Sequence, residues 1–396
     1  MGLISSSEYS WNQKQGLRKL QGIPEHIDIS QIKINAENEA MSHRLKGQLY
    51  RQKGDLVKAI REYSKAIELD QSNEIFYLNR GGIYSEIGKD DLAIKDLSKA
   101  IQLNPNLINA YFNRGEAKRT KGDYAGAIKD FSKGIELDPH DFEFYGRRAL
   151  AYSGIKKFYL AINDCNKVVK NDPQNDEAIF LRGETYYRIG EYEKAIADFS
   201  KGLELDPNFL EGRRLRGNAY ITVGKLEKAL GDFTYVTSID PDNAYAHSKC
   251  GEIHLTKSDF QNAVENFTRV IELDPEDYHA YANRGICFSE LGYLEKAEID
   301  CLKALQIDDK DPQVHFILGI VQMKAGNLKG AIDAFSQAIE LDPDNSHIFL
   351  LRASLNKILG DEKAVEKDIK TAAKLSGEDE DKLRRKYLTN SKNEEK

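Results

Sequence analysis

Cysteine and histidine are the residue types from which structural zinc sites are mostly built. Cys250 and His254 are four residues apart, so on a helix their side chains would share one face and could contact one ion. The sequence offers no second such pair to complete the four ligands of a structural zinc site. We therefore expect no metal. We interpret the four cysteines as buried free thiols: Cys165, Cys250, Cys287 and Cys301.

Residue patterns that support catalysis are also missing from the sequence. The recurrent glycines belong to predicted helix pairs or to their turns, so none forms a loop that could bind phosphate. Paired carboxylates recur as Glu-Leu-Asp-Pro, a signal that ends a helix. No Ser/His/Asp or Cys/His set can be placed as a nucleophile and its base. We expect a protein that is not an enzyme and needs no cofactor.

Basic residues recur every 34 positions and could form a row that binds phosphate. The row comprises Lys46, Arg80, Arg114, Arg148, Arg182, Arg216, Arg284 and Arg352. An acidic residue follows each of them by sixteen positions: Glu62, Asp96, Asp130, Asp164, Asp198, Asp232, Asp300 and Asp368. Two repeats lack both charges: Cys250 stands in place of the basic residue and Asn266 in place of the acidic one, and Leu318 and Ala334 do so two repeats later. Because a lone buried charge is costly, this joint loss favours an ion pair between two helices over ligand binding.

The amino-acid composition is that of a globular protein with a small excess of acidic over basic residues. The 396 residues include 57 basic and 64 acidic side chains, and 40% of the residues are apolar. Phosphate neutralisation dominates nucleic-acid affinity, so a net charge of −7 without a basic tract argues against a nucleic-acid partner. The start has only a short apolar run, and no stretch reaches the ~18 apolar residues of a membrane span. We expect a soluble cytoplasmic protein.

The whole central region is a repeat with a period of 34 residues. Prolines mark it at Pro105, Pro139, Pro173, Pro207, Pro241, Pro275 and, two steps later, Pro343. A small-residue column follows the same step: Gly47, Gly81, Gly115, Ala149, Gly183, Gly217, Gly251, Gly285, Gly319 and Ala353. Within the unit 176–209, apolar residues recur at helical spacing on both sides of Gly190. Each unit is therefore predicted to be two helices joined by a turn, and Asp141, Asn175, Asn243, Asp277 and Asn345 are predicted helix N-caps.

These columns resemble the tetratricopeptide repeat (TPR), which has small residues at positions 8 and 20, an aromatic at 24 and proline at 32. The resemblance implies an all-α fold, a right-handed α-α superhelix in which helix A of each repeat lines a concave surface and helix B a convex one. Position 7, usually leucine in the family, is here the basic column. Ten repeats are expected at 40–73, 74–107, 108–141, 142–175, 176–209, 210–243, 244–277, 278–311, 312–345 and 346–379.

The resemblance also places a peptide-binding groove on the concave surface. Asparagine amides there could donate to and accept from a peptide main chain, although asparagine is also an ordinary surface residue. Phe112 is expected to stand free of packing and offer apolar area. The candidate groove residues are Asn79, Asn109, Phe112, Asn113, Arg147, Arg214, Asn218, Lys249 and Asn283. The carboxylate clamp of chaperone-binding members is incomplete, since Lys249 stands where asparagine is required and Asn283 where a basic residue is required.

Both ends of the chain differ from the repeats. The last two repeats carry a candidate apolar partner patch of Phe316, Ile320, Met323 and Leu350, unless a helix at 380–388 caps it. The segment 1–39 is predicted to be a partly helical arm, and 380–396 a capping helix with a polar tail. Met1-Gly2 and Ser6 fit the N-myristoylation pattern, so a membrane contact is expected only if Gly2 is lipidated.

The sequence leads to two functional hypotheses. The first is a non-catalytic scaffold or adaptor, a monomer when alone, that binds an extended peptide or a helix of a protein partner in its concave groove. The alternative is a permanent structural subunit of a large assembly.

Overall fold

The structure is a computed structural model that describes residues 39–388. These residues form twenty-one helices and no strand, which confirms the all-α prediction. The first helix of each repeat, helix A, is α2 (Glu39–Gln52), α4 (Glu74–Glu86), α6 (Ile108–Thr120), α8 (Phe142–Gly154), α10 (Asp176–Arg188), α12 (Leu210–Thr222), α14 (Ala244–Thr256), α16 (Tyr278–Glu290), α18 (Pro312–Lys324) or α20 (Ser346–Leu359). The second, helix B, is α3 (Leu56–Leu69), α5 (Asp90–Leu103), α7 (Tyr124–Leu137), α9 (Phe158–Asn171), α11 (Tyr192–Leu205), α13 (Leu226–Ile239), α15 (Phe260–Leu273), α17 (Leu294–Ile307), α19 (Leu328–Leu341) or α21 (Glu362–Ser376). Helix α22 (Glu380–Leu388) follows the last pair.

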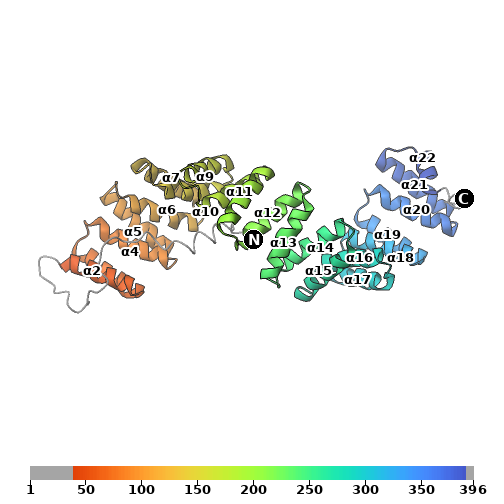
Figure 1. Cartoon of the computed structure of the whole chain (residues 1–396), viewed down its shortest axis with the longest axis horizontal. Coiled ribbons are helices and arrows are strands. Elements are labelled where there is room, and N and C mark those ends of the chain that lie inside the picture. The colour runs from red at the N-terminus through yellow and green to blue at the C-terminus, as the bar shows by residue number, and fades with distance from the viewer. Residues whose placement is uncertain (1–38, 389–396) are drawn as a thin grey trace. The chain divides into compact units, whose positions relative to one another are not determined.

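The chain divides into two compact parts, Met1–Gly224 and Lys225–Lys396, and each is described by itself. Within a part, helix A packs against its own helix B, and helix B packs against the next helix A. Figure 1 shows the helices of each part following one another in chain order. Consecutive helices A also touch, as α4 and α6 do. Each part is therefore an α-solenoid, in which a repeat buries its apolar face against its neighbours.

The small-residue column lets the two helices of a repeat lie close together. A Cβ atom on Gly115 of α6 would lie 2.5 Å from Cε1 of Phe131 on α7, nearer than real Cβ contacts come. The aromatic ring of α7 thus occupies the space that a side chain on α6 would need. Phe131 itself is fully buried. Gly115 is therefore required by packing rather than by a turn.

Helix ends follow the predicted signals. The predicted N-caps accept a hydrogen bond from a backbone amide at the start of their helix: Asp141, Asn175, Asn243, Asp277 and Asn345. The residue between helix A and helix B adopts a left-handed backbone, for which glycine has no steric penalty, as at Gly190 with φ +82°. Lys156 and Ser258 hold the same position with φ of 58° and 60°.

Helix α22 closes the solenoid. Leu383 of α22 is 1% exposed and packs in one cluster with Phe349, Leu350 and Ile369 of the tenth repeat. Helix α22 thus covers apolar residues at the end of the tenth repeat. Across residues 39–388, none of the helices has both the length and the apolar character needed to cross a bilayer.

Candidate functional site

The predicted ion pairs form a regular row, the Arg–Asp ladder, between helices A and B. In six repeats the arginine binds the aspartate through two parallel hydrogen bonds of 2.6–2.9 Å: Arg80–Asp96, Arg114–Asp130, Arg148–Asp164, Arg182–Asp198, Arg284–Asp300 and Arg352–Asp368. Taken as whole residues, backbone included, the aspartates are at most 7% exposed. This fork-to-carboxylate geometry confirms a structural role in these repeats.

Each of these six arginines, and Arg216 of the sixth repeat, has a further partner that was not predicted. Its remaining nitrogen, Nη1, donates to a polar side chain sixteen residues earlier, on helix B of the preceding repeat. The acceptors are Ser64, Ser98, Ser132, Asn166, Ser200, Thr268 and Ser336, at 2.7–3.1 Å. A column of hydroxyl and amide residues sixteen positions before the arginines was the signal that could have revealed it.

Aromatic rings of the same helix A flank the ladder guanidinium. Arg148 lies 5.6 Å from the ring centres of both Tyr145 and Tyr152, one turn before and one turn after it. A ring face attracts a cation and shields it from water. In Arg182, the hydrogen bond to Asp198 raises the pKa of the guanidinium above its ordinary value, so the charged pair is maintained.

Three repeats depart from this pattern. In the first, Glu62 bonds to His43 Nδ1 at 2.6 Å and to Lys65 at 3.1 Å, and among the described residues it forms no pair with Lys46, so the predicted pair is wrong there. In the seventh, Cys250 lies 4.0 Å from Thr234 Oγ1. In the ninth, leucine and alanine replace the charged pair. The sixth pair, Arg216 and Asp232, spans the boundary between the two parts and stays a prediction.

The expectation that Phe112 stands free of packing is wrong. Its side chain is 4% exposed and makes an edge contact with Phe144, with ring centres 5.3 Å apart. It also lies 6.2 Å from Phe131 in the same core cluster. Position 5 of the repeat thus reaches the core between α6 and the next repeat. The family resemblance placed it on the inner surface, and the error arose because inner and core positions are adjacent on helix A.

A charged network lies beside Phe112, where α6 and α8 meet. Arg147 of α8 donates to Glu116 Oε2 of α6 at 3.1 Å, and its guanidinium lies 5.8 Å from the centre of the Phe112 ring. Arg119 also donates to Glu116, at 3.2 Å. Burial lowers the pKa of Arg147, which is 4% exposed, while the carboxylates of Glu116 and Glu143 oppose that shift. The predicted groove residue Arg147 is therefore held in place by protein contacts.

The predicted asparagines differ in how accessible they are. Asn79 of α4 is 3% exposed, whereas Asn113 is half-buried and Asn109 is exposed, both on α6. The Asn113 amide nitrogen lies 3.8 Å from the place of a Cβ on Gly82 of α4, so it reaches across to the preceding helix A. We call Asn109, Asn113, Glu116 and Arg147 the helix-A wall. Asn109, Asn113 and Arg147 belong to the predicted groove, whereas Glu116 was not predicted and is added by its bond to Arg147.

The remaining groove residues are more scattered. Arg214 of α12 pairs with Glu211, and half-buried Asn218 lies one turn later. In the second part, Lys249 of α14 pairs with Glu252 at 2.7 Å. Asn283 on α16 is half-buried.

The apolar patch of the last repeats is largely packed within the protein. Leu350 is 4% exposed in the cluster that α22 covers, so its assignment to an open partner patch is wrong. Phe316, Ile320 and Met323 pack partly against the core of the ninth repeat. The apolar residues here serve mainly to join the last repeats and their cap.

Other predicted features concern metals, thiols and the N-terminus. Within residues 39–388, no three His, Cys, Asp or Glu side chains gather in a way that could hold a metal ion. Cys250 and His254 take separate partners, because His254 Nδ1 bonds to Asp259 at 2.9 Å. All four cysteines are free and buried, as predicted. Gly2 and the predicted arm up to residue 38 lie outside the described residues.

Comparisons with known proteins agree with this architecture. Family models described as "TPR repeat" match residues 47–88 and 81–119. Models described as "Tetratricopeptide repeat" match residues 108–141, 142–175, 177–209, 251–312 and 312–345. Together these matches include more than half of the chain. No curated protein matches the sequence.

Solved structures with similar folds are TPR proteins and an assembly subunit. The C-terminal part of a TPR repeat-containing protein from Cytophaga hutchinsonii is 21% identical, with a TM-score of 0.53 over 60% of this chain and 97% of that chain. YrrB, a TPR protein with an unusual peptide-binding site, is 23% identical over 46% of this chain and 95% of its own, with a TM-score of 0.42. The APC/C hetero-tetramer Cut9–Hcn1 contains a chain that is 16% identical over 88% of this chain and 76% of its own, with a TM-score of 0.45. At these identities the likeness concerns the fold. The matches of the family models, together with the twenty-one helices of the described region, show that the chain belongs to the tetratricopeptide-repeat family.

Proposed function

We propose that this protein is a non-catalytic adaptor that binds an extended peptide segment of a protein partner along its helix-A wall. We further propose that it acts in the cytoplasm and is a monomer on its own. The observation that carries the proposal is the network of Glu116 and Arg147 beside the asparagines of α6. The network is held by its own internal contacts, so it gives the asparagine amides of α6 a rigid support from which to meet a peptide.

Preorganised polar groups suit the binding of a peptide main chain. An asparagine amide can donate to a peptide carbonyl and accept from a peptide amide, whatever the peptide side chains are. Rigid groups lose little entropy on binding, which favours affinity. Asn109 and Asn113 are one helical turn apart on α6, and both are accessible. They are therefore the residues that we expect to contact the peptide directly.

The test uses peptides selected from a displayed random library against the whole protein. The double variant Asn109→Ala with Asn113→Ala should weaken the selected peptides by roughly 1–2 kcal/mol, as loss of interface contacts does. Lys133→Ala on α7 is the matched control, since its pair with Glu136 is exposed on helix B. Binding would be followed by calorimetry, and circular dichroism would check that helicity is unchanged.

Two outcomes would contradict the proposal. Peptides that bind the double variant as tightly as the parent protein would show that the helix-A wall is not the site. A random library that yields only binders equally sensitive to Lys133→Ala would place binding on helix B.

The alternative function, a permanent subunit of a large assembly, is favoured by apolar side chains exposed on helices B. Val57 is 80% exposed, Tyr159 76% and Ile299 65%. Single exposed apolar residues are ordinary on a protein surface, so this alternative requires that a partner covers them. Size-exclusion chromatography of the purified protein separates the two candidates, since an adaptor should run as a monomer, whereas an assembly subunit should self-associate or aggregate.

A further inference from the structure

The ninth repeat lacks every residue that forms the arginine site of the regular repeats. Leu318 replaces the arginine, Ala334 replaces the aspartate, and Leu302 replaces the polar residue of the preceding helix B. The flanking aromatic positions are His315 and Gln322. Because leucine is shorter than arginine and alanine shorter than aspartate, the site is left partly empty.

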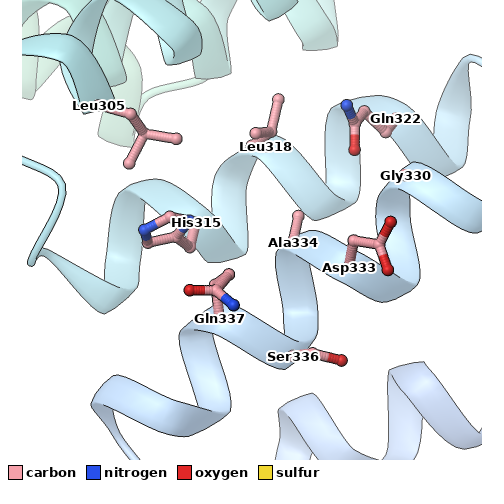
Figure 2. Close-up of a pocket in the computed structure, with 9 residues that line it drawn as sticks. All are labelled: Leu305, His315, Leu318, Gln322, Gly330, Asp333, Ala334, Ser336 and Gln337. Atoms are coloured by element: carbon pink, nitrogen blue, oxygen red, sulfur yellow. The ribbon is translucent and has the colours of Figure 1, made fainter.

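A cavity of about 480 Å³ lies at this place. Its lining comes from α17, α18 and α19, as Figure 2 shows: Leu305, His315, Leu318, Gln322, Gly330, Asp333, Ala334, Ser336 and Gln337. The volume exceeds that of one side chain, so part of the main chain carrying such a side chain could also enter.

Two lining residues offer acceptor oxygens, Gln322 and Asp333, whereas Ser336 is already engaged, since it accepts from Arg352 Nη1 at 2.8 Å and donates to the Ile332 carbonyl at 2.7 Å. Gln322 Oε1 is buried and has no hydrogen-bond partner among residues 39–388, while its Nε2 donates to Glu298 at 2.9 Å. An acceptor without a donor is costly when it is buried. Asp333 adds a carboxylate to the lining, and its side chain is exposed. His315 uses Nε2 to donate to the Asp309 carbonyl at 3.0 Å, so that nitrogen is already engaged.

The lining contains apolar residues and no lysine or arginine, and this limits the chemical class of ligand that fits. Leu305, Leu318 and Ala334 can contact an alkyl chain, and none of the nine lining residues is lysine or arginine. A ligand that matches this lining has an apolar stem and a cationic end with several N–H donors. Among side chains, arginine has both, and its planar group can bond to an amide oxygen and a carboxylate together.

We propose that the cavity of the ninth repeat binds an arginine side chain of a partner protein. The partner arginine enters the place that the chain's own arginine fills in six other repeats. Its guanidinium donates to the exposed carboxylate of Asp333 and, once the Gln322 amide turns toward the opening, to Gln322 Oε1. Its stem lies on Leu305 and Leu318. This site is separate from the helix-A wall and does not depend on the function proposed for that wall.

The test titrates the whole protein with the blocked tripeptide Gly-Arg-Gly and follows the methyl NMR signals of Leu305 and Leu318. We expect saturable shifts of these methyl groups. The same peptide with citrulline, which keeps the shape of arginine but is neutral, should bind roughly tenfold more weakly, because hydrogen bonds from a charged donor are the stronger ones. Equal binding by the citrulline peptide or by Gly-Leu-Gly, or no saturable shift, would overturn the proposal.

A variant that fills the cavity with the chain's own arginine gives a second test. Leu318→Arg with Ala334→Asp and Leu302→Ser rebuilds the ladder in the ninth repeat and should abolish the response of Leu305 to the arginine peptide. The matched control is Cys250→Arg with Asn266→Asp, which rebuilds the pair in the seventh repeat and should leave binding unchanged. If the filled variant still binds the arginine peptide at the cavity, the proposal is wrong.

A milder variant guards against misfolding of the filled one. Asp333→Asn alters an exposed side chain and should weaken the arginine peptide about fivefold or more, as loss of a charged acceptor does, and should weaken the citrulline peptide less, because citrulline carries no charge of its own. Undiminished affinity for the arginine peptide in this variant would contradict the assignment.

Discussion

At the scale of single residues, each ladder arginine joins two repeats at once. Arg182 binds Asp198 of its own repeat and Asn166 of the preceding repeat. Its side chain is 18% exposed and the Asp198 side chain 10%. Removing one member alone leaves a partly buried charge, and that cost exceeds what the pair itself contributes.

We therefore predict that one substitution lowers the stability strongly and that two further substitutions restore much of it. Asp198→Ala should lower the free energy of unfolding by roughly 2 kcal/mol or more, and adding Arg182→Leu with Asn166→Leu should restore much of it. The triple variant reproduces the leucine, leucine and alanine set that the eighth and ninth repeats already contain. Denaturant unfolding measures both changes. Lys133→Ala should have little effect, because exposed pairs contribute at most about 1 kcal/mol; a triple variant no more stable than Asp198→Ala would refute the coupling.

The buried thiols give a second prediction at this scale. Burial raises the pKa of Cys250 to about 11 and that of Cys287 and Cys301 to about 12. Since the thiolate is the reactive form, all four thiols should resist alkylating reagents in the native protein and react only when their repeat opens. Mass spectrometry after timed labelling checks this, and fast labelling of any of them in the native protein would be inconsistent with the structure.

At the scale of helices, glycine has two opposite roles. Gly115 of α6 faces Phe131 at 2.5 Å from where its Cβ would be, whereas Gly231 of α13 has nothing within 4 Å of that position. Gly115→Ala should destabilise by roughly 1–3 kcal/mol through overpacking. Gly231→Ala should stabilise by about 0.5–1 kcal/mol, because alanine favours a helix. Thermal unfolding followed by circular dichroism compares them; equal effects would show that the close approach does not govern Gly115.

The helix pairs and the ladder could be predicted because both recur with the same 34-residue period. A residue and its partner sixteen positions away change together in several copies, so even one sequence reveals the pair. The inner surface could not be resolved in the same way. Phe112 and Asn113 are adjacent on α6 and their side chains leave the helix about 100° apart, so one is in the core and the other half-buried; the packing of α6 against its neighbours decides which.

The first repeat shows a further limit of the pattern. His43 replaces the usual aromatic one turn before the basic residue, and its ring takes the carboxylate that Lys46 was predicted to bind. Lys46 has a single ammonium group rather than a fork, so it does not impose the two-bond geometry of arginine. The acidic column therefore predicted a buried carboxylate correctly but not its partner.

At the scale of the whole molecule, stability is expected to vary along the chain. Repeats interact mainly with their neighbours, so opening should start where neighbours are held most weakly and at the ends. The seventh and ninth repeats lack the Arg–Asp pair, and we predict that they exchange amide hydrogens faster than the fourth and fifth. Hydrogen exchange read by mass spectrometry tests this, and uniform protection over residues 39–388 would contradict it.

Each ladder arginine bonds to a hydroxyl or amide side chain on helix B of the preceding repeat. This contact also determines which repeats can be neighbours. Deleting residues 176–209 would bring Arg216 into the place of Arg182, sixteen positions after Asn166, so the new junction would be chemically matched. Deleting residues 312–345 would instead set Arg352 against Leu302, an apolar side chain that cannot accept its hydrogen bond. Loss of a repeat by recombination is therefore tolerated at the first junction and penalised at the second. The order of repeats is specified locally, by the compatibility of each helix B with the helix A that follows it.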